Sequence, residues 1–579
     1  MAPQYSVPDE VRKLFQNAII QNPLVREHLP TGALEASRHV SFEGSNNPFI
    51  PINWRFAESI STLKAYEATV LNVLLKKKYG VGPVDVKINT NHAQLFIMSP
   101  LLWALDPEGA NLSAGKLMSP EGQGDLLKYF PEWDKYQTFS TYYRGAATNV
   151  YRTKDEKFFH LHGSMNPEPS LRFVGLPPDL PSADYESAIT VVGQAVSQYT
   201  ASDLQELART YRQAGDICLT TEEYAASPHG QANAGAGLFE IQKSELDTSS
   251  PATWWPATPL TSAARPLAGL KVVDLTRIIA GPTISRGLAQ LGASVMRITA
   301  PHLPDFSILH PDLNHGKWNA CLDLREEADR EKLRELIKDA DIFLQGYRPG
   351  VLDKFGFGEA DVLKMGRERG GDRGGIVYCA ENCYGWNGPW YERSGWQQIS
   401  DAVTGVSYEY GRALGNDEPV TPVFPNSDFC TGVIGITGVM TALIRRAEEG
   451  GSYSVKTALN YYNQWLIKNV GVYPKDVWEE LRARQPEIFR HYHGMNHTLP
   501  RVMASLFAND AKSNDDGKLF KPEFFTEYHV KNLGKTMRIV APVLEFPNGE
   551  VQPGFHVGTR TNGVDQPKWP DDLETEVVN

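Results

Sequence analysis

The sequence has little cysteine. Five cysteines are scattered over 579 residues, a spacing that builds no disulfide framework and is typical of a reducing compartment. Cys379 and Cys383 lie four positions apart, but no matching pair of Cys or His follows them. His160 and His162 alternate on a predicted strand without a third ligand nearby, which favours core or surface positions. We therefore predict no metal site.

Positive charge is also scarce. The formal net charge is −12, and Lys and Arg form no dense stripe, which argues against a nucleic-acid partner. Apolar runs stay shorter than the roughly 18–20 residues that span a bilayer, so we predict no membrane partner.

Targeting patterns are missing as well. The first residues, MAPQYSVPDEVRKLF, lack the basic-then-apolar pattern of a secretory signal, and EVVN at the other end differs from the peroxisomal tripeptide. We therefore expect a cytoplasmic protein, with the mitochondrial and peroxisomal matrix as alternatives.

The glycine-rich cradle for a dinucleotide, GxGxxG after a strand, is also absent. The first strand of the clearest strand–helix pattern is followed by TRIIAGP (276–282) instead. This argues against a nicotinamide or flavin cofactor, and we predict no tightly bound cofactor.

The sequence does contain a regular alternation of strands and helices. Short β-branched or apolar runs occur at 269–275, 293–299, 341–347 and 374–380, with helical patterns among them. Hydrophobic residues at 41% and charged residues at 22% are typical of a globular protein, and this length favours two or three domains. The alternation predicts an α/β fold with a doubly wound, parallel, Rossmann-like sheet, which binds ligands at the carboxyl ends of its strands.

Composition divides the chain into five parts. Residues 244–267 are rich in Pro, Ser, Thr and Ala without a period, which indicates a linker. A predicted hairpin, YRTKDEKFFHLHG (151–163), and proline-rich loops mark a smaller mixed α+β domain before it. The predicted parts are a partial, degenerate large-domain-like copy (1–145), the small mixed domain (146–243), the linker (244–267), a large domain (268–470), and a helical segment with a C-terminal return to the large domain (471–579).

Two long helical patterns are similar to each other at an offset of 370 residues. FAESISTLKAYEATVLNVL contains Glu58 near its start, and SDFCTGVIGITGVMTALI contains Asp428. Each continues through a turn to a strand and an apolar stretch, which indicates an old internal duplication; two unrelated helix–strand units are the alternative. Because no glycines follow Glu58, we interpret it as vestigial or structural.

Asp428 places a charge where a proline-broken loop becomes a long apolar helix, in PVFPNSDFCTGVIGITG (422–438). The residues alone leave two explanations open. Asp is a favoured N-cap residue, and losing a cap costs about 1 kcal/mol. The alternative is a reactive carboxylate, whose charged form the helix dipole would favour.

Five motifs occur in an order that resembles the class III CoA-transferase family. They are LAGLKVVDLTRIIAGP, LAQLGASVMRI, HGKWNACLDL, ADIFLQGYRPGVLDKFGFG and PNSDFCTG, and the resemblance covers about 267–470. Parts of 50–240 and the late stretch MRIVAPVLEFPNGEVQPGFHVG are similar to the same family, which includes formyl-CoA and carnitine CoA-transferases. Because small-domain-like sequence comes first, the chain resembles a fused or permuted member with a partial first copy.

The resemblance implies an enzyme that exchanges CoA between an acyl-CoA and a small carboxylic acid. Asp428 would attack the thioester, forming a mixed anhydride and then an aspartyl-CoA. Thr431 and Gly432 would support this nucleophile with room and with exposed N–H groups. The coenzyme A thioester would be a co-substrate, and the protein would be a homodimer or a pseudo-dimeric monomer.

The resemblance also implies residues that bind CoA. Arg277, Arg325 and Lys354 are the cations that would face its phosphates. Where the family has an arginine after the second strand, this chain has Ala300, with His302 nearby. The full predicted set is Arg277, Ile279, Ala280, Leu322, Arg325, Gly346, Tyr347, Lys354 and Tyr384.

Two other functions stay open at this point. An acyl-CoA racemase on the same fold is one, but racemising relatives carry a His-Asp pair where this chain has Trp396 and Gln397. Without that pair no group would return the proton to the opposite face of the substrate. A catalytically decayed CoA-binding protein is the other, suggested by the irregular order of domains.

Overall fold

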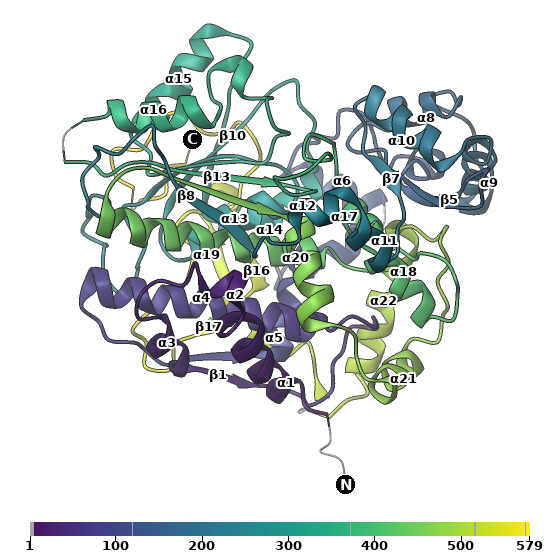
Figure 1. Ribbon diagram of the computed structural model, residues 1–579, viewed down its shortest axis with the longest axis horizontal. Coiled ribbons are helices and arrows are strands. Elements are labelled where there is room, and N and C mark those ends of the chain that lie inside the picture. The colour runs from purple at the N-terminus through teal and green to yellow at the C-terminus, as the bar shows by residue number, and fades with distance from the viewer. Residues whose placement is uncertain (1–4, 119, 371, 515–516, 574, 579) are drawn as a thin grey trace.

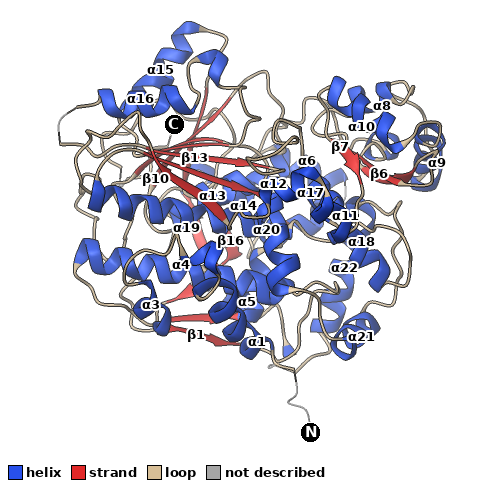
Figure 2. Cartoon of the chain, viewed as in Figure 1, coloured by secondary structure: helices blue, strands red, loops and turns tan. Residues whose placement is uncertain are grey.

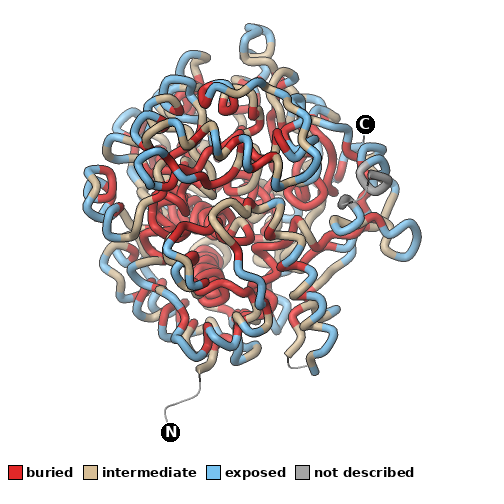
Figure 3. The backbone as a smooth tube through the Cα atoms, turned by 90° about the vertical axis from the view of Figure 1, so that its right-hand side faces the viewer, coloured by how far each residue is buried: buried red, intermediate tan, exposed pale blue. Residues whose placement is uncertain are grey.

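The computed structural model describes residues 5–118, 120–370, 372–514, 517–573 and 575–578. In this part of the chain the strands form four sheets, of seven, four, three and three strands. Figure 1 shows the course of the chain, and Figure 2 shows helices packed around the largest sheet. Buried backbone fills the interior, and the exposed segments lie mainly in the outer loops and helices (Figure 3).

The seven-stranded sheet has the order β11-β10-β9-β12-β13-β14-β8. The six strands from β9 to β14 run parallel, and β8 pairs antiparallel with β14 at the edge. After β9 the chain adds β10 and β11 on one side of β9, and it later adds β12 on the other side. Where the order of strands changes direction in this way, a crevice forms at the carboxyl ends of β9 and β12. The strand bounds are β8 (Phe239–Lys243), β9 (Lys271–Leu275), β10 (Ser294–Thr299), β11 (Lys317–Cys321), β12 (Ile342–Gln345), β13 (Val377–Asn382) and β14 (Tyr453–Ala458).

The four strands predicted from the sequence are confirmed as β9, β10, β12 and β13, with slightly different ends. Helices cover both faces of this sheet, because successive side chains of a strand point to opposite faces. Val272 belongs to the core that includes α13 (Ala280–Gln290) and α19 (Asn426–Glu449). Val273 belongs to the core that includes α15 (Glu327–Lys338) and α16 (Glu359–Glu368).

A second layered unit lies against the outer side of α19. Helix α4 (Phe56–Tyr79) packs on α19, and a small sheet of order β1-β2-β17 lies beyond it. Its strands are β1 (Val40–Glu43), β2 (Val86–Asn89) and β17 (Leu544–Glu545). The resulting order of layers is sheet, α19, α4, sheet, so the two long helices form the centre of the molecule.

The two central helices correspond in detail. Both α4 and α19 span 24 residues. Each leads through a turn and a strand to a helix of seven residues, α5 (Thr90–Phe96) in the first case and α20 (Leu459–Trp465) in the second. Equal lengths in the same order support the internal duplication inferred from the sequence.

Residues 146–243 form most of a small α/β unit. The predicted hairpin is confirmed as β5 (Asn149–Arg152) and β6 (Phe158–Leu161), with β7 (Gly215–Ile217) beside β6. A separate core joins these strands to α8 (Glu168–Phe173), α9 (Tyr185–Val196) and α10 (Ala201–Thr210). The predicted boundary at 243 differs from the structure, because β8 crosses to the large sheet and pairs with β14.

The predicted linker, 244–267, contains no helix or strand, and Trp255 anchors it through a 2.9 Å hydrogen bond to the carbonyl of Ala268. The C-terminal part returns to both units. On the N-terminal unit it forms the sheet β15-β16-β3-β4 and adds β17 to β2. On the large domain, Val557 belongs to the core beside β9, Thr559 donates a hydrogen bond to the carbonyl of His310, and Asp565 reaches β11 at Asn319. The bounds are α21 (Lys475–Arg484), α22 (Met495–Asp510), β15 (Phe525–Val530), β16 (Lys535–Val540), β3 (Ala104–Leu105) and β4 (Leu112–Ser113).

The other helices are short and connect these units. Their bounds are α1 (Val7–Leu14), α2 (Pro23–Arg26), α3 (Ala33–Ala36), α6 (Pro120–Leu127), α7 (Tyr142–Gly145), α11 (Thr221–Ala226), α12 (Pro228–Asn233), α14 (His310–Leu313), α17 (Gln397–Thr404) and α18 (Val406–Ala413). Helix α19 has the length and apolarity of a membrane-crossing helix, but 94% of its most apolar window is buried inside the protein. This burial is typical of a core helix.

Helices α13 and α19 approach closely at glycines. A Cβ at Gly432 of α19 would lie 2.5 Å from Cβ of Thr283, and a Cβ at Gly287 of α13 would lie 2.1 Å from Cδ1 of Ile436. Contacts this short are not possible, so the backbones pack at a distance that larger residues would forbid. The packing fixes the start of α13 against the start of α19.

We expect Gly432→Ala to lower the melting temperature. Alanine gains about 1 kcal/mol in helix propensity, but overpacking a core typically costs about 1–3 kcal/mol, and Cβ of Thr283 cannot move without its backbone. Thermal unfolding measures the change. Gly82→Ala is the matched control, because no heavy atom lies within 4 Å of a Cβ there. An unchanged or higher melting temperature for Gly432→Ala would contradict the packing described.

Candidate active site

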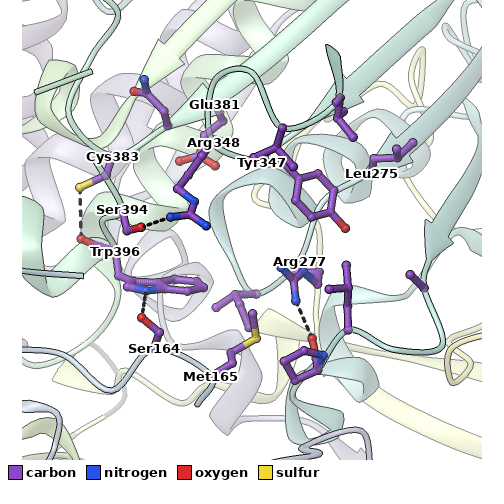
Figure 4. A pocket seen from close by; sticks show the side chains of 18 of the residues that line it. Ser164, Met165, Leu275, Arg277, Tyr347, Arg348, Glu381, Cys383, Ser394 and Trp396 are labelled. Carbon is purple, nitrogen blue, oxygen red and sulfur yellow. Dashed lines mark hydrogen bonds between the residues drawn. The ribbon is translucent and has the colours of Figure 1, made fainter. Parts of the chain in front are cut away.

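A cavity of about 750 Å³ opens at the carboxyl ends of β9, β12 and β13. Its volume lies in the usual range for small-molecule and cofactor sites. The loops after these strands supply one part of the wall, and the start of α19 supplies Asp428. The small domain supplies another part, through residues 164–166 and 212–213. Figure 4 shows Trp396 and Ser164 facing Tyr347 and Arg277 around this space.

The loop after β9 is held in a strained shape. Ile278, a bulky β-branched residue, has φ of 73°, in a region that costs about 1–3 kcal/mol for such residues. Gly281 has no room for a side chain, because a Cβ there would lie 2.6 Å from Cβ of Thr276. The loop brings the N-terminus of α13 to the cavity, which Ile279 and Ala280 line. Amide N–H groups in a first helical turn lack partners within the helix and can bind a ligand oxygen.

Asp428 is the third residue of α19 and lines the cavity with only 9% of its surface exposed. Within the described chain, no group donates a hydrogen bond to its carboxyl or pairs with it. Burial raises its pKa well above the usual value, and the charges of Glu381 and then Asp401 raise it further. The effect of the helix dipole, expected to favour the charged form, is outweighed by desolvation. The capping explanation is wrong, because the N-cap is Pro425 and no side chain caps the helix.

Thr431 and Gly432 do not line the cavity. Both lie inside α19, where their N–H groups bond to carbonyls four residues earlier in the helix. Gly432 faces Thr283 of α13 instead. The prediction that these two residues expose N–H groups to the substrate is therefore corrected, and the first turn of α13 is the part of the wall that offers such donors.

The predicted role of Tyr384 in CoA binding is also corrected. Its ring is buried beside His229 and Trp390, and its hydroxyl donates a 2.9 Å hydrogen bond to Asp216. It is not among the residues that line the cavity. Tyr384 thus packs the small domain against the loop after β13, and the sequence could not show that its side chain turns away from the cavity.

The other predicted CoA residues come together on the cavity wall. Arg277 donates a 2.7 Å hydrogen bond to the carbonyl of Pro304, and its guanidinium lies 5.3 Å from the ring centre of Tyr347. Arg325 is exposed and already paired with Asp323. The predicted residues on the wall are Arg277, Ile279, Ala280, Leu322, Arg325, Gly346, Tyr347 and Lys354. Their part in binding CoA stays a prediction.

Sequence reasoning missed three arginines on this wall, Arg212, Arg348 and Arg393, of which Arg393 is paired with Asp216. Arg348 donates hydrogen bonds to Ser394 at 2.7 Å and to the carbonyl of Arg212 at 3.2 Å. Burial, and then the charges of Arg212 and Arg277, lower the pKa of Arg348, so the wall is short of negative charge at this point. Arg348 directly follows Tyr347 in YRPG and could have been found there. Arg212 belongs to the small domain, and no local pattern places it at the site.

A stack of rings connects the small domain to the cavity. The indole of Trp396 donates a 3.1 Å hydrogen bond to Ser164, and the ring of His162 stacks on it with centres 5.9 Å apart. The ring of His160 stacks behind His162 at 5.8 Å. Burial lowers the pKa of His160 to about 4, which keeps this ring neutral. Both histidines are core residues, one of the two positions that the sequence favoured, and they support Trp396 on the cavity wall.

Two further carboxyls influence Asp428. Glu381, the next-to-last residue of β13, lines the cavity, and burial raises its pKa to about 7. Asp401 lies behind the start of α19 and accepts hydrogen bonds from Asn463 at 2.9 Å and from Ser427 at 3.4 Å. Burial raises its pKa to about 7 as well. Motif reasoning gave no reason to choose either residue.

Across the described ranges, no group of three or more His, Cys, Asp and Glu is arranged to hold a metal ion. Cys379 and Cys383 are both buried and unpaired by any disulfide. Burial raises the pKa of both thiols, which is typical of inert structural cysteines.

Glu58, the counterpart of Asp428 in α4, is in a closed environment. It is fully buried and accepts hydrogen bonds from the hydroxyls of Tyr5 and of Tyr473, the latter at 2.9 Å. Arg55 lies 3.8 Å away. Two phenols and a guanidinium thus occupy the space that a substrate would need, which supports a structural role for Glu58.

The sequence is similar to proteins of known name over nearly its whole length. It is 48% identical over 580 residues to an acetyl-coenzyme A transferase, nodX, of Hypoxylon pulicicidum, covering 99% of this chain and 95% of that protein. It is 32% identical to an acyl-CoA transferase of Gibberella moniliformis, covering 89% and 88%. A CAIB/BAIF family protein from Brucella suis shares 28% identity with a TM-score of 0.32, over 35% of this chain and 56% of that one.

A family model also matches part of the chain. The model of CoA-transferase family III matches residues 267–486, which contain the cavity wall from Arg277 to Leu459 and the nucleophile candidate Asp428. The chain is an enzyme that belongs to CoA-transferase family III.

Proposed function

We propose that this enzyme exchanges CoA between an acyl-CoA thioester and a carboxylic acid, with Asp428 as the covalent nucleophile. The observation that carries the proposal is a buried carboxyl, without a hydrogen-bonding or ion-pairing partner in the described chain, on the wall of a cavity at the carboxyl ends of parallel strands. Such a group is costly to keep, so its presence indicates use.

The reaction needs four covalent steps. The Asp428 carboxylate attacks the thioester carbonyl, which gives a mixed anhydride and releases the CoA sulfur. The sulfur then attacks the aspartyl carbonyl, which gives an aspartyl-CoA thioester and frees the first acid. The acceptor carboxylate attacks this thioester to form a second anhydride, and the sulfur finally attacks the acceptor's carbonyl, which restores Asp428. No water or nucleotide is consumed, and the number of thioester bonds is unchanged.

A carboxylate is a weak nucleophile, and the surroundings of Asp428 raise its reactivity. Removing Asp428 from water raises its reactivity toward a carbonyl held close to it. We assign the N–H groups in the first turn of α13, at Ile279 and Ala280, to the oxyanion that forms on the thioester carbonyl. This assignment replaces Thr431 and Gly432, whose N–H groups are used within α19.

CoA phosphates would bind at the mouth of the cavity. Arg277, Arg325 and Lys354 were predicted for this role, and Arg348 joins them because its charge is poorly balanced. Arginine and lysine bind phosphate through charge-assisted hydrogen bonds. Ala300 and His302 line the same cavity in the place where the family has an arginine, so the adenine end is held differently in this chain.

The acyl and acceptor groups are proposals of substrate class only. The name of the relative from Hypoxylon pulicicidum makes acetyl-CoA the first donor to assay. The coenzyme enters and leaves as a co-substrate, and we propose no tightly bound cofactor or metal. A cytoplasmic location, with the mitochondrial and peroxisomal matrix as alternatives, and the absence of nucleic-acid and membrane partners stay proposals from the sequence.

We further infer a doubly wound large domain (268–470) and a pseudo-dimeric monomer with one active site. In one chain, the small domain and the large domain supply different parts of the cavity wall. The counterpart site around Glu58 is closed by Tyr5, Tyr473 and Arg55. One bound acyl-CoA per chain in a monomer is therefore the expected stoichiometry.

Replacing the nucleophile tests the proposal. We expect Asp428→Ala to lower kcat for CoA exchange by about 10³-fold or more. Incubation of the parent enzyme with acetyl-CoA, followed by hydroxylamine and peptide mass spectrometry, should modify Asp428. Asp476→Asn, an exposed substitution on α21, is the control. Unchanged turnover in Asp428→Ala contradicts the proposal, and exchange of the α-hydrogen with heavy water without labelling would indicate a racemase instead.

The phosphate-binding assignment predicts a change in KM alone. Lys354→Ala should raise KM for acyl-CoA by about tenfold, since one charge-assisted contact contributes about 1.5 kcal/mol or more. kcat should stay close to the parent value, because Lys354 is far along the substrate from the thioester in this assignment. Steady-state kinetics measure both values. Lys364→Ala, on the exposed side of α16, should change neither, and an equal KM for the two variants would refute the assignment.

Stability should depend on pH through Asp428. Because burial raises its pKa, the unfolded chain releases this proton at a lower pH than the native protein does. The native state therefore loses stability as pH rises from the ordinary pKa of Asp toward the raised one. We expect Asp428→Asn to raise the melting temperature more at pH 8 than at pH 4.5. Asp476→Asn should show no such difference, and an equal gain at both pH values would contradict the burial of a charge.

A further inference from the structure

Glu381 is a second carboxyl on the wall of the cavity that holds Asp428. It lies in β13, and a Cβ at Gly346, in the loop after β12, would be 3.3 Å from one of its carboxyl oxygens. The carboxyl thus lies over the crevice between the ends of β12 and β13. Figure 4 labels Glu381 among the side chains of that wall. Among the described residues, none forms a hydrogen bond or an ion pair with its side chain.

Within the described chain, no cation is paired with Glu381, and two other carboxyls act on the same part of the cavity. Asp428 faces it from α19, and Asp401 acts on the same region from α17. The thiol of Cys383 is neutral, since burial and nearby carboxylates raise its pKa well above the usual value. Arg277, Arg348 and Arg393 line the same cavity, but none of them forms an ion pair with Glu381 or lowers its pKa, and Arg393 is paired with Asp216 at 3.1 Å. Like charges that share a buried site cannot both ionise at little cost, so an ionised Asp428 requires a protonated Glu381.

The proposed reaction needs a proton donor near the departing CoA sulfur, and a protonated Glu381 could supply that proton. When Asp428 attacks the thioester, its negative charge passes to the departing sulfur, and a free thiolate would lie in a poorly hydrated cavity. The same sulfur must later attack the aspartyl carbonyl and must then be deprotonated. A group that holds one proton, near the sulfur, and can give and take it would lower both barriers.

We propose, on the basis of the function proposed above, that Glu381 gives its proton to the departing CoA sulfur and takes it back when the sulfur returns. In the first step the O–C bond of the anhydride forms, the C–S bond breaks, and the Glu381 proton passes to sulfur, so one negative charge moves from Asp428 to Glu381. In the second step the Glu381 carboxylate removes the proton from the thiol, the C–S bond to Asp428 forms, and the first acid leaves as a carboxylate. The cavity carries one negative charge before and after the first step.

The experiment compares leaving groups in the enzyme and its variants. A general acid contributes about 10²-fold or more, so Glu381→Gln should lower kcat/KM for the acyl-CoA thioester by about that factor. The selenoester of the same acyl group with the selenium analogue of CoA leaves as a selenolate, which needs no proton. With this substrate we expect Glu381→Gln to come within about threefold of the parent enzyme. Glu381→Asp, which keeps an acid, should recover part of the loss with the thioester.

The pH profile separates proton transfer from a change in local charge. The parent enzyme needs an ionised Asp428 and a protonated Glu381, so kcat/KM should rise and then fall with pH. Glu381→Gln should lose the alkaline fall, and its acid limb should move to lower pH because one carboxylate near Asp428 is gone. Asp401→Asn is the matched control, since it also removes a carboxylate that acts on Asp428. It should move the acid limb in the same direction and keep the alkaline fall.

The outcomes distinguish the two proposals. An equal loss for thioester and selenoester in Glu381→Gln, or an alkaline fall that persists in it, refutes the proton transfer while Asp428 labelling still supports the nucleophile. If acetyl-CoA never modifies Asp428 in the parent enzyme, both proposals fail together. Folding is checked by thermal unfolding, and removal of a buried carboxyl should not lower the melting temperature of Glu381→Gln.

Discussion

The site depends on one physical constraint, the burial of the Asp428 carboxyl, which is paired with no cation among the residues that the structure describes. Its pKa is raised by desolvation first and by Glu381 and Asp401 second. A surface carboxylate would be stable and unreactive, and one paired with arginine would be stable and less nucleophilic. The enzyme instead keeps a carboxyl that is unstable in its charged form, which is the property that the proposed nucleophile requires.

Packing of the core makes this burial possible. Glycines in α13 and α19 let the two helices approach closely, which brings both helix starts to the crevice at the ends of β9 and β12. One helix supplies the carboxyl and the other supplies free N–H groups. Helix α4 covers the far side of α19 and removes water from it. The comparison of Asp428 with Glu58 shows how surroundings decide the outcome, because equivalent acids open to a cavity in one case and are closed by phenols in the other.

The sequence was sufficient for the strands, the central helix and most of the cavity wall. β-branched runs and helical periods predicted β9, β10, β12 and β13, and the motifs that carry the family resemblance also carry Arg277, Tyr347 and Lys354. The sequence was insufficient for residues whose role at the site depends on the direction of the side chain or on contacts with residues far away in the chain. Tyr384 turns toward Asp216, Gly432 faces α13, and Arg212 arrives from another domain. Glu381 escaped notice because its importance comes from its neighbours in space.

The fate of the oxygen atoms tests the central claim most directly. The enzyme can be turned over with acyl-CoA and an acceptor acid whose carboxylate carries oxygen-18, and the peptide that contains Asp428 then analysed by mass spectrometry. In the proposed exchange one oxygen of Asp428 leaves with the first acid, and the acceptor oxygen becomes the bridge of the second anhydride and stays on Asp428. This peptide should therefore gain one heavy oxygen in the first turnover and approach two after several turnovers. An unlabelled Asp428 after many turnovers would show that the acyl group never passes through this carboxyl, and the account would be wrong.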